Sequence, residues 1–458
     1  MTTPALKPDR TAFTHSPHVA SYYAASAMPS PVRPTLAGTV DCDVCVVGGG
    51  IAGCSTALHL AERGYKVVLL EDHRVGWGAS GRNGAQALFG VASGQAKLER
   101  LIGPADARLV WDVTVEGLAL MRDLIARHAI DCNWVNGHLQ VAIKPRHDDE
   151  LRSELDILNT KYGYDSIRYM PRDEVRSIVA TERYISALYD TNSGHLHPLN
   201  YTLGLAAAAE RLGARIFEGT RALSFQDGTH DDSSSASTGS QAKGRASTGI
   251  ALVRTAQGEV RARHVVLCGN VYLGDTAQSL ASKIMAVGTY IVATEPLGAE
   301  RAHSLITNDA AVADSNWVLD YFRRSTDHRL LFGGRVNYSG LSSFDAPGAT
   351  RRRMVSVFPQ LADVKIDYTW GGEVDITLNR APHFGRLAPN VYFLQGFSGH
   401  GVVLTGIAGK LIAEAISGTA ERFDVFARIP HRNFPGGLAL RRPALVLAML
   451  YFRLKDLL

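Results

Sequence analysis

Cysteine is scarce in this chain, with only 5 in 458 residues. A small, odd number of cysteines argues against a disulfide-stabilised scaffold and suits the reducing cytoplasm. Cys42 and Cys45 form a CxxC motif, but no second pair exists to complete a tetrahedral zinc site. We therefore predict no metal site and interpret these two thiols as part of a buried strand.

The sequence also lacks long apolar runs and a marked surplus of charge. No stretch reaches the ~18 consecutive apolar residues of a membrane span, and the N-terminus has no apolar core of the kind that a signal peptide needs. Lysine and arginine number 48 against 44 aspartates and glutamates, a net charge of +4. So small and evenly spread a surplus argues against a nucleic-acid partner. We expect a soluble cytoplasmic protein; its oligomeric state stays open.

Glycine-rich junctions between strands and helices are the main positive feature. The apolar run 44–47 leads into Gly48-Gly49-Gly50-Ile51-Ala52-Gly53 and then into helical spacing that ends at Gly64. A second junction follows the predicted strand 391–394, where glycines at 396, 399 and 401 precede a helix predicted over 402–416. This pattern predicts an α/β protein with a Rossmann-like, doubly wound domain built from discontinuous segments.

The residues between the two junctions predict an inserted α+β substrate domain with a mixed or antiparallel sheet. Strand-like runs occur at 138–143, 289–294, 317–322 and 330–333, and the region 98–183 is mainly helical in period. The predicted organisation is an N-terminal extended arm (1–38), a cofactor-binding domain (39–97, 184–275 and 371–425), a substrate domain (98–183 and 276–370) and a C-terminal extension (426–458). The segment 227–249 is almost wholly Ser, Gly, Asp, Thr and Ala, so we expect a disordered insertion there.

The first junction fits a dinucleotide-binding fingerprint. Gly48 allows a tight turn, Gly50 lets a pyrophosphate approach the backbone, and Gly53 permits close packing of helix on strand. The helix N-terminus offers its free N–H groups and positive potential to the phosphates. Glu71 lies 18 positions beyond Gly53, after a strand predicted over 66–70, where a carboxylate can accept hydrogen bonds from an adenosine ribose.

Two further segments favour FAD over NAD. The glycine-rich stretch 76–86 closely follows Glu71, and its glycines let the backbone pass close to a large flat cofactor. The junction 396–401 aims a second helix N-terminus at the far end of an elongated ligand, where it stabilises the negative charge on the N1 and C2 carbonyl edge of a reduced flavin. The alternative interpretation of this junction is a plain glycine cap and turn.

Several short motifs carry a resemblance to a known family. They are SYYAAS at 21, CDVCVVGGG at 42, ALHLAERG at 57, GWGASGRNG at 76, GHLHPLN at 194, GNVYLGD at 269, FPQLADVKIDYTW at 358, QGFSGHGV at 395 and FPGG at 434. From about Tyr22 to near the C-terminus, the chain resembles the D-amino-acid-oxidase-like FAD-dependent amine oxidoreductases, and within them most resembles the γ-glutamylputrescine oxidases.

The resemblance implies an FAD-binding domain with a substrate domain, and it implies a reaction. A γ-glutamylated amine would be oxidised at its terminal primary amine by oxygen, giving an aldehyde, ammonia and hydrogen peroxide. The cofactor-binding residues predicted from the fingerprint and the resemblance together are Gly48, Gly50, Ile51, Ala52, Gly53, Glu71, Gly78, Ala79, Ser80, Arg82, Asn83, Gly84, Ala222, Gly269, Gly396, Ser398, Gly399, His400, Gly401 and Val402.

Two departures from the family pattern bear on the flavin. Ala85 stands where the family usually has glycine, so we expect the adjoining loop to be slightly shifted. Some relatives attach flavin to a cysteine just ahead of the stretch matched here by residues 377–382. No cysteine follows Cys268 in this chain, so we predict noncovalent FAD.

Three residues are predicted for the catalytic site: Tyr321, Arg323 and His400. Tyr321 and Arg323 alternate on a predicted strand, so both can face one pocket, in which an arginine would hold the carboxylate of the γ-glutamyl group. His400 either contacts the isoalloxazine ring or only caps the helix. Arg335 and Arg380 are alternatives to Arg323.

The remaining substrate contacts are also inferred by residue type. Glu373 is a candidate acceptor for the ammonium of the γ-glutamyl group. An aromatic lining would keep the reacting amine neutral by desolvation, and Tyr321, Phe322 and Trp370 are candidates, with core packing as the alternative. His195 and His197 lack metal-ligand companions, and we interpret them as structural.

The apolar run 444–452, flanked by basic residues, is too short to span a bilayer. We expect it to dock on the body of the protein rather than on a membrane surface. Two alternatives to an oxidase stay open: a membrane-associated FAD-dependent amino-acid or amine dehydrogenase that passes electrons to quinone, and a flavoprotein subunit or sensor without turnover.

Overall fold

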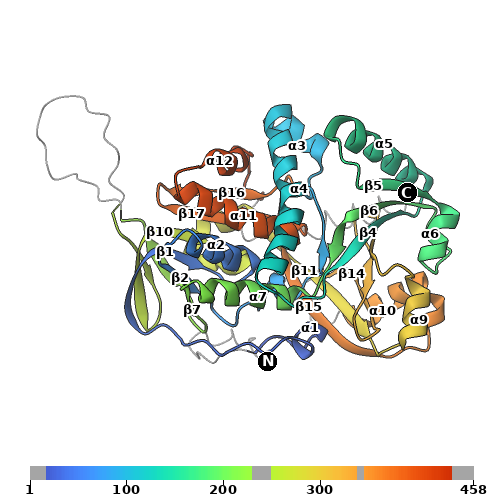
Figure 1. Ribbon diagram of the computed structural model, residues 1–458, viewed down its shortest axis with the longest axis horizontal. Coiled ribbons are helices and arrows are strands. Elements are labelled where there is room, and N and C mark those ends of the chain that lie inside the picture. The colour runs from blue at the N-terminus through green and yellow to red at the C-terminus, as the bar shows by residue number, and fades with distance from the viewer. Residues whose placement is uncertain (1–16, 229–248, 338–344, 436–458) are drawn as a thin grey trace, which may run out of the picture.

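A computed structural model describes residues 17–228, 249–337 and 345–435 of the chain. Their strands form an 8-stranded and a 9-stranded sheet, with helices packed around both (Figure 1). The predicted α/β class with mixed sheets is confirmed. Most of the predicted insertion 227–249, and the whole apolar run 444–452, lie outside the described residues.

The first sheet has a parallel centre. Its strand order is β16 (His383–Ala388), β17 (Val391–Gln395), β10 (Gly258–Leu267), β1 (Gly38–Val47), β2 (Val67–Leu70) and β7 (Arg215–Phe217), while β9 (Ala251–Arg254) pairs with β10 and with β8 (Ser224–Gln226). The last four residues of β1 and all of β2 are buried or nearly so. Such continuous apolar runs are typical of parallel strands covered on both faces.

Helices α2 (Ile51–Ala61), α7 (Pro198–Arg211) and α11 (Gly401–Ile416) pack together over one face of this sheet (Figure 1). Helices α2 and α11 approach very closely: Ser55 Oγ donates to Gly406 O at 2.6 Å, and a Cβ on Gly409 would lie 2.5 Å from Thr56 N. The contact brings the N-termini of both helices to the same layer of the protein.

The second sheet is mixed, with β12 parallel to β4 and the other pairs antiparallel. Its order is β15 (Ile366–Thr377), β11 (Ile284–Thr294), β14 (Leu330–Asn337), β13 (Tyr321–Arg324), β12 (Ala311–Asp314), β4 (Val135–Ala142), β6 (Ser186–His195) and β3 (Gln86–Ala87), with β5 (Ile167–Pro171) on β6. Phe322, Phe332 and Phe358 meet in a separate core against this sheet.

The other helices are α1 (Tyr22–Ala25), α3 (Gln95–Ile102), α4 (Pro104–Arg127), α5 (Pro145–Tyr162), α6 (Arg172–Ile178), α8 (Gln278–Ala281), α9 (Ala299–Leu305), α10 (Ala346–Val357) and α12 (Glu421–Ala427). No single helix within the described ranges is long and apolar enough to cross a membrane. Helices α11 and α12 pass that test of length and composition only as a pair, which is bent by 118°.

The structure differs from the predicted organisation at several places. Strands β3 and β6, and residues 371–377 of β15, fall in ranges predicted for the cofactor-binding domain but pair within the second sheet. Helix α4 falls in the predicted substrate domain, yet it packs on α11, where a Cβ on Gly117 would lie 2.8 Å from Val403. Local periodicity indicates a strand or a helix, but it carries no information about which neighbour that element will pack against.

The N-terminal arm is not wholly extended. Residues 22–25 form α1, capped by Ser21 Oγ, which accepts a hydrogen bond from Ala24 N at 3.1 Å. Tyr22 and Tyr23 are buried, and the ring of Tyr23 meets that of Trp370 with 5.2 Å between the centroids. Aromatic burial therefore holds this part of the arm on the body of the protein.

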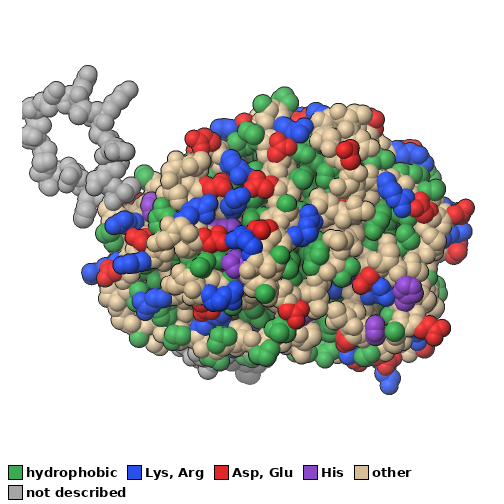
Figure 2. All heavy atoms as spheres, in the orientation of Figure 1, with side chains coloured by type: hydrophobic (Ala, Val, Ile, Leu, Met, Phe, Trp, Pro, Cys, Tyr) green, Lys and Arg blue, Asp and Glu red, His purple; other side chains and the backbone are tan. Residues whose placement is uncertain are grey.

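Charge is mixed over the surface. On the face shown in Figure 2, lysine and arginine side chains are interspersed with aspartate and glutamate side chains, and hydrophobic side chains are scattered among them. Ion pairs at the protein surface include Arg301 with Asp363 and Arg428 with Asp106. This face carries no extended patch of one sign.

Candidate FAD site

A cavity of about 440 Å³ lies at the carboxyl ends of β1, β2 and β10, between the N-termini of α2 and α11. The predicted cofactor residues that line it are Gly48, Gly50, Ile51, Ala52, Glu71, Gly78, Ala79, Ser80, Asn83, Ala222, Gly269, Gly399, Gly401 and Val402. Those that do not line it are Gly53, Arg82, Gly84, Gly396, Ser398 and His400. The structure thus brings the two glycine junctions to a common cavity.

The turn after β1 is built around glycine. Gly48 has a left-handed φ of 110°, and a Cβ there would lie 2.8 Å from the carbonyl of Cys268. A Cβ on Gly53 would lie only 1.9 Å from Gly48 O, so helix and turn are in direct backbone contact. Gly50 is the N-cap of α2 and offers no side-chain cap. Ile51 N donates to Ser80 Oγ at 2.9 Å, and both Ile51 and Ala52 line the cavity. The first turn of the helix therefore borders the cavity, where its positive end favours an anion.

Glu71 contacts that turn from the end of β2 and is partly buried. Its Oε2 accepts from Gly49 N at 2.6 Å and its Oε1 accepts from His73 N at 2.9 Å. Burial outweighs these two hydrogen bonds and raises the pKa of Glu71 to about 7. Each carboxylate oxygen keeps a further lone pair, so the side chain can still accept hydrogen bonds from ribose hydroxyls.

The loop after Glu71 is held by its own side chains. Arg82 Nε donates to Trp77 O at 2.6 Å, and its guanidinium lies 3.9 Å from the centre of the Trp77 ring. Asn83 Nδ2 donates to the carbonyls of Ala79 and Ser80 at 3.0 and 2.9 Å. Arg82 and Asn83 thus fix the shape of the segment 77–83, which contributes four predicted residues to the cavity wall.

Ala85 follows this loop in a left-handed conformation, with φ of 66°. That conformation costs a non-glycine residue roughly 1–2 kcal/mol, so glycine would adopt it with less strain. The strain is held in place by Asn83, whose Oδ1 accepts from Ala85 N at 2.7 Å.

The second glycine junction is organised by Asp375, a residue that the sequence analysis missed. Asp375 is buried, and its Oδ2 accepts from the backbone N–H groups of both Gly396 and Phe397, the latter at 2.8 Å. Burial raises its pKa to about 6. Asn270 bonds to the same carboxyl, while its own Oδ1 is buried without a hydrogen-bond partner. Such an unpaired polar atom at a cavity wall fits a site built for a polar ligand.

His400 is the N-cap residue of α11, but its side chain makes no cap hydrogen bond. Its Nε2 instead bonds to Phe89 O at 2.6 Å, and burial lowers its pKa. The ring therefore ties α11 to the segment before α3. Capping by this side chain, one of the two predicted roles, is not what the structure shows.

The predicted substrate residues are divided between two surroundings. The Tyr321 ring packs against the loop that contains Gly84: a Cβ on Gly84 would lie 2.5 Å from the ring. Arg323 is 5% exposed and donates to Tyr23 Oη at 3.3 Å and to Arg324 O at 2.9 Å. Its guanidinium thus lies in the packing beneath α1. The predicted strand around Tyr321 and Arg323 is present, as β13. Alternation along a strand carries no information about the N-terminal arm, whose Tyr23 covers Arg323.

The other candidates have simpler surroundings. Phe322 belongs to the core of the second sheet, and Trp370 Nε1 donates to Arg82 O at 3.1 Å. Glu373 is exposed, and Arg335 lies on β14 opposite Tyr290 of β11. The histidines interpreted as structural are both buried: His195 Nε2 bonds to Asp309 O at 2.7 Å, and His197 Nδ1 accepts from Asn200 N at 3.1 Å.

Further residues of the cavity wall escaped the sequence analysis. They are Asp72, His73, Trp77, Thr220, Arg221, Asn270, Tyr272, Asp375, Phe397 and Thr405, with several apolar neighbours. GNVYLGD at 269 was the nearest signal, since it contains the turn formed by residues 270–272. Among the described residues, no group of three His, Cys, Asp or Glu side chains could hold a metal ion.

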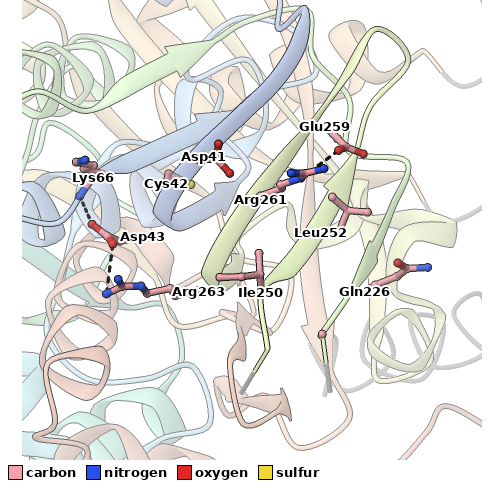
Figure 3. A pocket seen from close by; sticks show the side chains of 11 residues that line it. Asp41, Cys42, Asp43, Lys66, Gln226, Ile250, Leu252, Glu259, Arg261 and Arg263 are labelled. Carbon is pink, nitrogen blue, oxygen red and sulfur yellow. Dashed lines mark hydrogen bonds and ion pairs between the residues drawn. The ribbon is translucent and has the colours of Figure 1, made fainter. Parts of the chain in front are cut away.

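A second hollow, of about 750 Å³, lies beside β1, β9 and β10 at the edge of the first sheet (Figure 3). Its charged side chains largely pair with one another, as Asp43 does with Arg263 and Glu259 with Arg261. None of the residues predicted for cofactor or substrate lines it. The candidate site is therefore the cavity between α2 and α11.

Comparison with known proteins assigns the chain to a family. The model of the family "DAO: FAD dependent oxidoreductase" matches residues 43–415. The chain belongs to this family of FAD-dependent oxidoreductases. It is 41% identical over 440 residues to gamma-glutamylputrescine oxidoreductase of Escherichia coli (strain K12), covering 96% of this chain and 98% of that protein. It is 37% identical to the probable oxidoreductase OrdL of Haemophilus influenzae, covering 97% and 99%.

Solved structures agree with the DAO fold. Glycine oxidase from Bacillus cereus superposes with a TM-score of 0.65, covering 85% of this chain and 99% of that chain at 21% sequence identity. L-proline dehydrogenase from P. horikoshii gives a TM-score of 0.66, with 86% and 98% covered at 19% identity. The cofactor is FAD, and the α2 N-terminus at the cavity wall, the glycine cradle at Gly48 and the partnerless Asn270 Oδ1 fit such a ligand.

We expect this FAD to be released by acid or heat denaturation. Cys268 lines the cavity, but burial raises the pKa of its thiol to about 12, so it stays protonated and unreactive. After precipitation, the yellow absorption should be found in the supernatant. Flavin that stays with the precipitated protein through repeated washing would show a covalent link.

Proposed function

We propose that this DAO-family enzyme is an FAD-dependent oxidase of γ-glutamylated polyamines in the cytoplasm. In the proposed reaction, γ-glutamylputrescine, oxygen and water give γ-glutamyl-γ-aminobutyraldehyde, ammonia and hydrogen peroxide, a step of putrescine catabolism. The observation that supports this most is the similarity over nearly the whole length of both chains to gamma-glutamylputrescine oxidoreductase.

The proposed division of the cavity follows its two ends. Gly48 to Ala52 would bind the pyrophosphate at the α2 terminus, and Glu71 would bind the adenosine ribose. The segment 396–402, held by Asp375, would lie at the isoalloxazine end. FAD, when bound, supplies the chemistry by accepting a hydride from the carbon that carries the amine.

On the substrate side, the chain's part is to orient the amine and keep it neutral. Tyr321 is the predicted catalytic-site residue whose ring is packed against the loop 78–84, so it is our candidate for direct substrate contact. A wall of such aromatic surface removes water from the amine and lowers its pKa. A catalytic role for Arg323 and His400 stays a prediction from the sequence. Their hydrogen bonds support a positioning role, for Arg323 toward Tyr23 and for His400 toward Phe89.

The function is tested by anaerobic reduction of the bound flavin. The panel contains γ-glutamylputrescine, putrescine, sarcosine and D-amino acids, and loss of the yellow absorption bands is followed. We expect γ-glutamylputrescine to reduce the flavin fastest, and peroxide and aldehyde to form in equal amounts in air. Preferential reduction by sarcosine or a D-amino acid would contradict the substrate. Flavin reduction by the amine without peroxide formation in air would identify a dehydrogenase. If no amine reduces the flavin, the protein would be a flavoprotein without turnover.

A further inference from the structure

Two cations beyond the lining of the cavity, Arg380 and Lys97, are near enough for the charge of Arg380 to act on Lys97. Arg380 is in the turn between β15 and β16, and Lys97 is on α3. The Arg380 guanidinium lies 6.0 Å from the centre of the Trp317 ring, and its Nε is buried without a hydrogen-bond partner. Of the acids that the structure describes, none forms an ion pair with Arg380 or Lys97 at 4.0 Å or less.

This arrangement is unfavourable for the protein alone. Burial lowers the pKa of Arg380, and burial together with the charges of Arg380 and Arg100 lowers the pKa of Lys97. Most arginines in similar surroundings here have a carboxylate partner, as Arg33 has with Glu210 and Glu218. A half-buried guanidinium without a carboxylate is a site at which an anionic ligand would replace the missing partner.

The backbone conformation of Arg380 also indicates a role for its side chain. Its φ of 60° is left-handed, a conformation that glycine adopts without strain and that costs other residues energy. Arg380 N donates to Thr377 O at 3.1 Å, so the turn is tight. An arginine is therefore held where glycine would serve the turn better, and the side chain itself needs a reason.

The position of the turn provides that reason. Thr377 N donates to Ser398 Oγ at 3.3 Å, and a Cβ on Gly396 would lie 2.6 Å from Thr377 Cγ2. The turn of Arg380 thus rests on the second glycine junction, and the charge of Arg380 reaches His400 within that junction. This is the α11 end of the cavity, where we place the isoalloxazine, and not the Glu71 end.

We propose that Arg380, assisted by Lys97, binds the carboxylate of the substrate at the end remote from the reacting amine and so selects γ-glutamylated over free polyamines. The inference rests on the proposed function. Putrescine brings two ammonium groups and no anion, so the two cations would repel it. γ-Glutamylation converts one of these amines to an amide and adds an α-ammonium together with a carboxylate, and this carboxylate is the group that a guanidinium can bind in bidentate fashion.

The test compares kcat/KM for γ-glutamylputrescine and for N-acetylputrescine, which has an amide and the same terminal amine but neither the carboxylate nor the α-ammonium of the γ-glutamyl group. In Arg380→Gly, the ratio of the two values should fall about 30- to 100-fold, the effect expected of losing a charge-assisted pair. In Lys97→Met, it should fall about 2- to 5-fold. Arg100→Met, on the exposed side of α3, is the control and should change the ratio less than about twofold.

Two further measurements separate the outcomes. Thermal unfolding should show Arg380→Gly to be at least as stable as the parent, because glycine relieves the φ strain. Glutarate should perturb the flavin spectrum of the parent holoenzyme and do so at least about 10-fold more weakly in Arg380→Gly. An unchanged substrate ratio, together with unchanged glutarate binding, would overturn the proposal. Failure of the parent enzyme to oxidise γ-glutamylputrescine, with glutarate binding still dependent on Arg380, would refute the proposed substrate and leave the anion subsite.

Discussion

Replacing Gly48 with alanine is expected to yield a folded protein that is nearly free of FAD. The left-handed φ of 110° costs alanine roughly 1–2 kcal/mol. The new methyl would also lie 2.8 Å from the carbonyl of Cys268, closer than a Cβ contact allows. Since β1 and β10 are fixed by their parallel pairing, the turn itself must move, and with it the donors of α2. We expect FAD affinity to fall at least about 100-fold, roughly 2.7 kcal/mol, by fluorescence titration of the apoprotein.

Gly64→Ala is the matched control for this variant. Gly64 also has a left-handed φ, of 81°, but a Cβ there would meet no atom within 4 Å. The control therefore carries the conformational strain without the collision. Its FAD affinity should equal that of the parent, with only a small loss of stability. Equal FAD affinity in Gly48→Ala and Gly64→Ala would show that the approach of Gly48 to Cys268 does not shape the cofactor site.

Replacing Asp375 with alanine should disrupt the second junction while the sheets stay intact. The change leaves the N–H groups of Gly396 and Phe397 buried and unpaired, at a cost of about 1–3 kcal/mol each. The junction is expected to relax by turning these donors, so that FAD affinity falls about tenfold or more and the visible flavin spectrum shifts. Asp375→Asn keeps an acceptor oxygen and should lie between the parent and Asp375→Ala in both measurements.

Asp190 supplies the control for a purely structural loss. It is buried on β6, and its carboxylate accepts from Asn192 N at 2.9 Å, Ser193 N at 3.2 Å and Tyr164 Oη at 2.9 Å. It does not line the cavity. Asp190→Ala should lower the thermal midpoint at least as much as Asp375→Ala, yet leave the flavin spectrum and affinity unchanged. A spectral shift of equal size in both variants would assign the effect to stability alone.

The features that could be predicted from the sequence are those that depend on neighbouring residues in the chain. The strand from 44 to 47, the turn Gly48 to Gly53 and the helix after it are written in consecutive residues, because each needs only an apolar run, a glycine and a helical period. The same holds for β17 and α11 at the second junction. That both junctions border a single cavity was a correct prediction from the physics of helix N-termini.

The unpredicted part depends on distant partners. Asp375 acts on N–H groups 21 and 22 positions away, and its setting in a strand resembles that of any alternating polar residue. Arg323 was predicted to reach a pocket because nothing in its strand shows that Tyr23, 300 positions earlier, would cover it. The sheet to which β6 and β15 belong was equally hidden, since a period of two identifies a strand and not its neighbours.

The order in which the chain visits its two sheets has a consequence for engineering. After β1 and β2 in the first sheet come β3 to β6 in the second; β7 to β10 return to the first, β11 to β15 belong to the second, and β16 and β17 complete the first. A single cut anywhere between β3 and β15 therefore leaves neither fragment with a complete sheet. Chimaeras with a relative that are made by one crossover in that range should join foreign strands within both sheets at once. Exchanging the whole first sheet between relatives requires three separated stretches together, β1 to β2, β7 to β10 and β16 to β17.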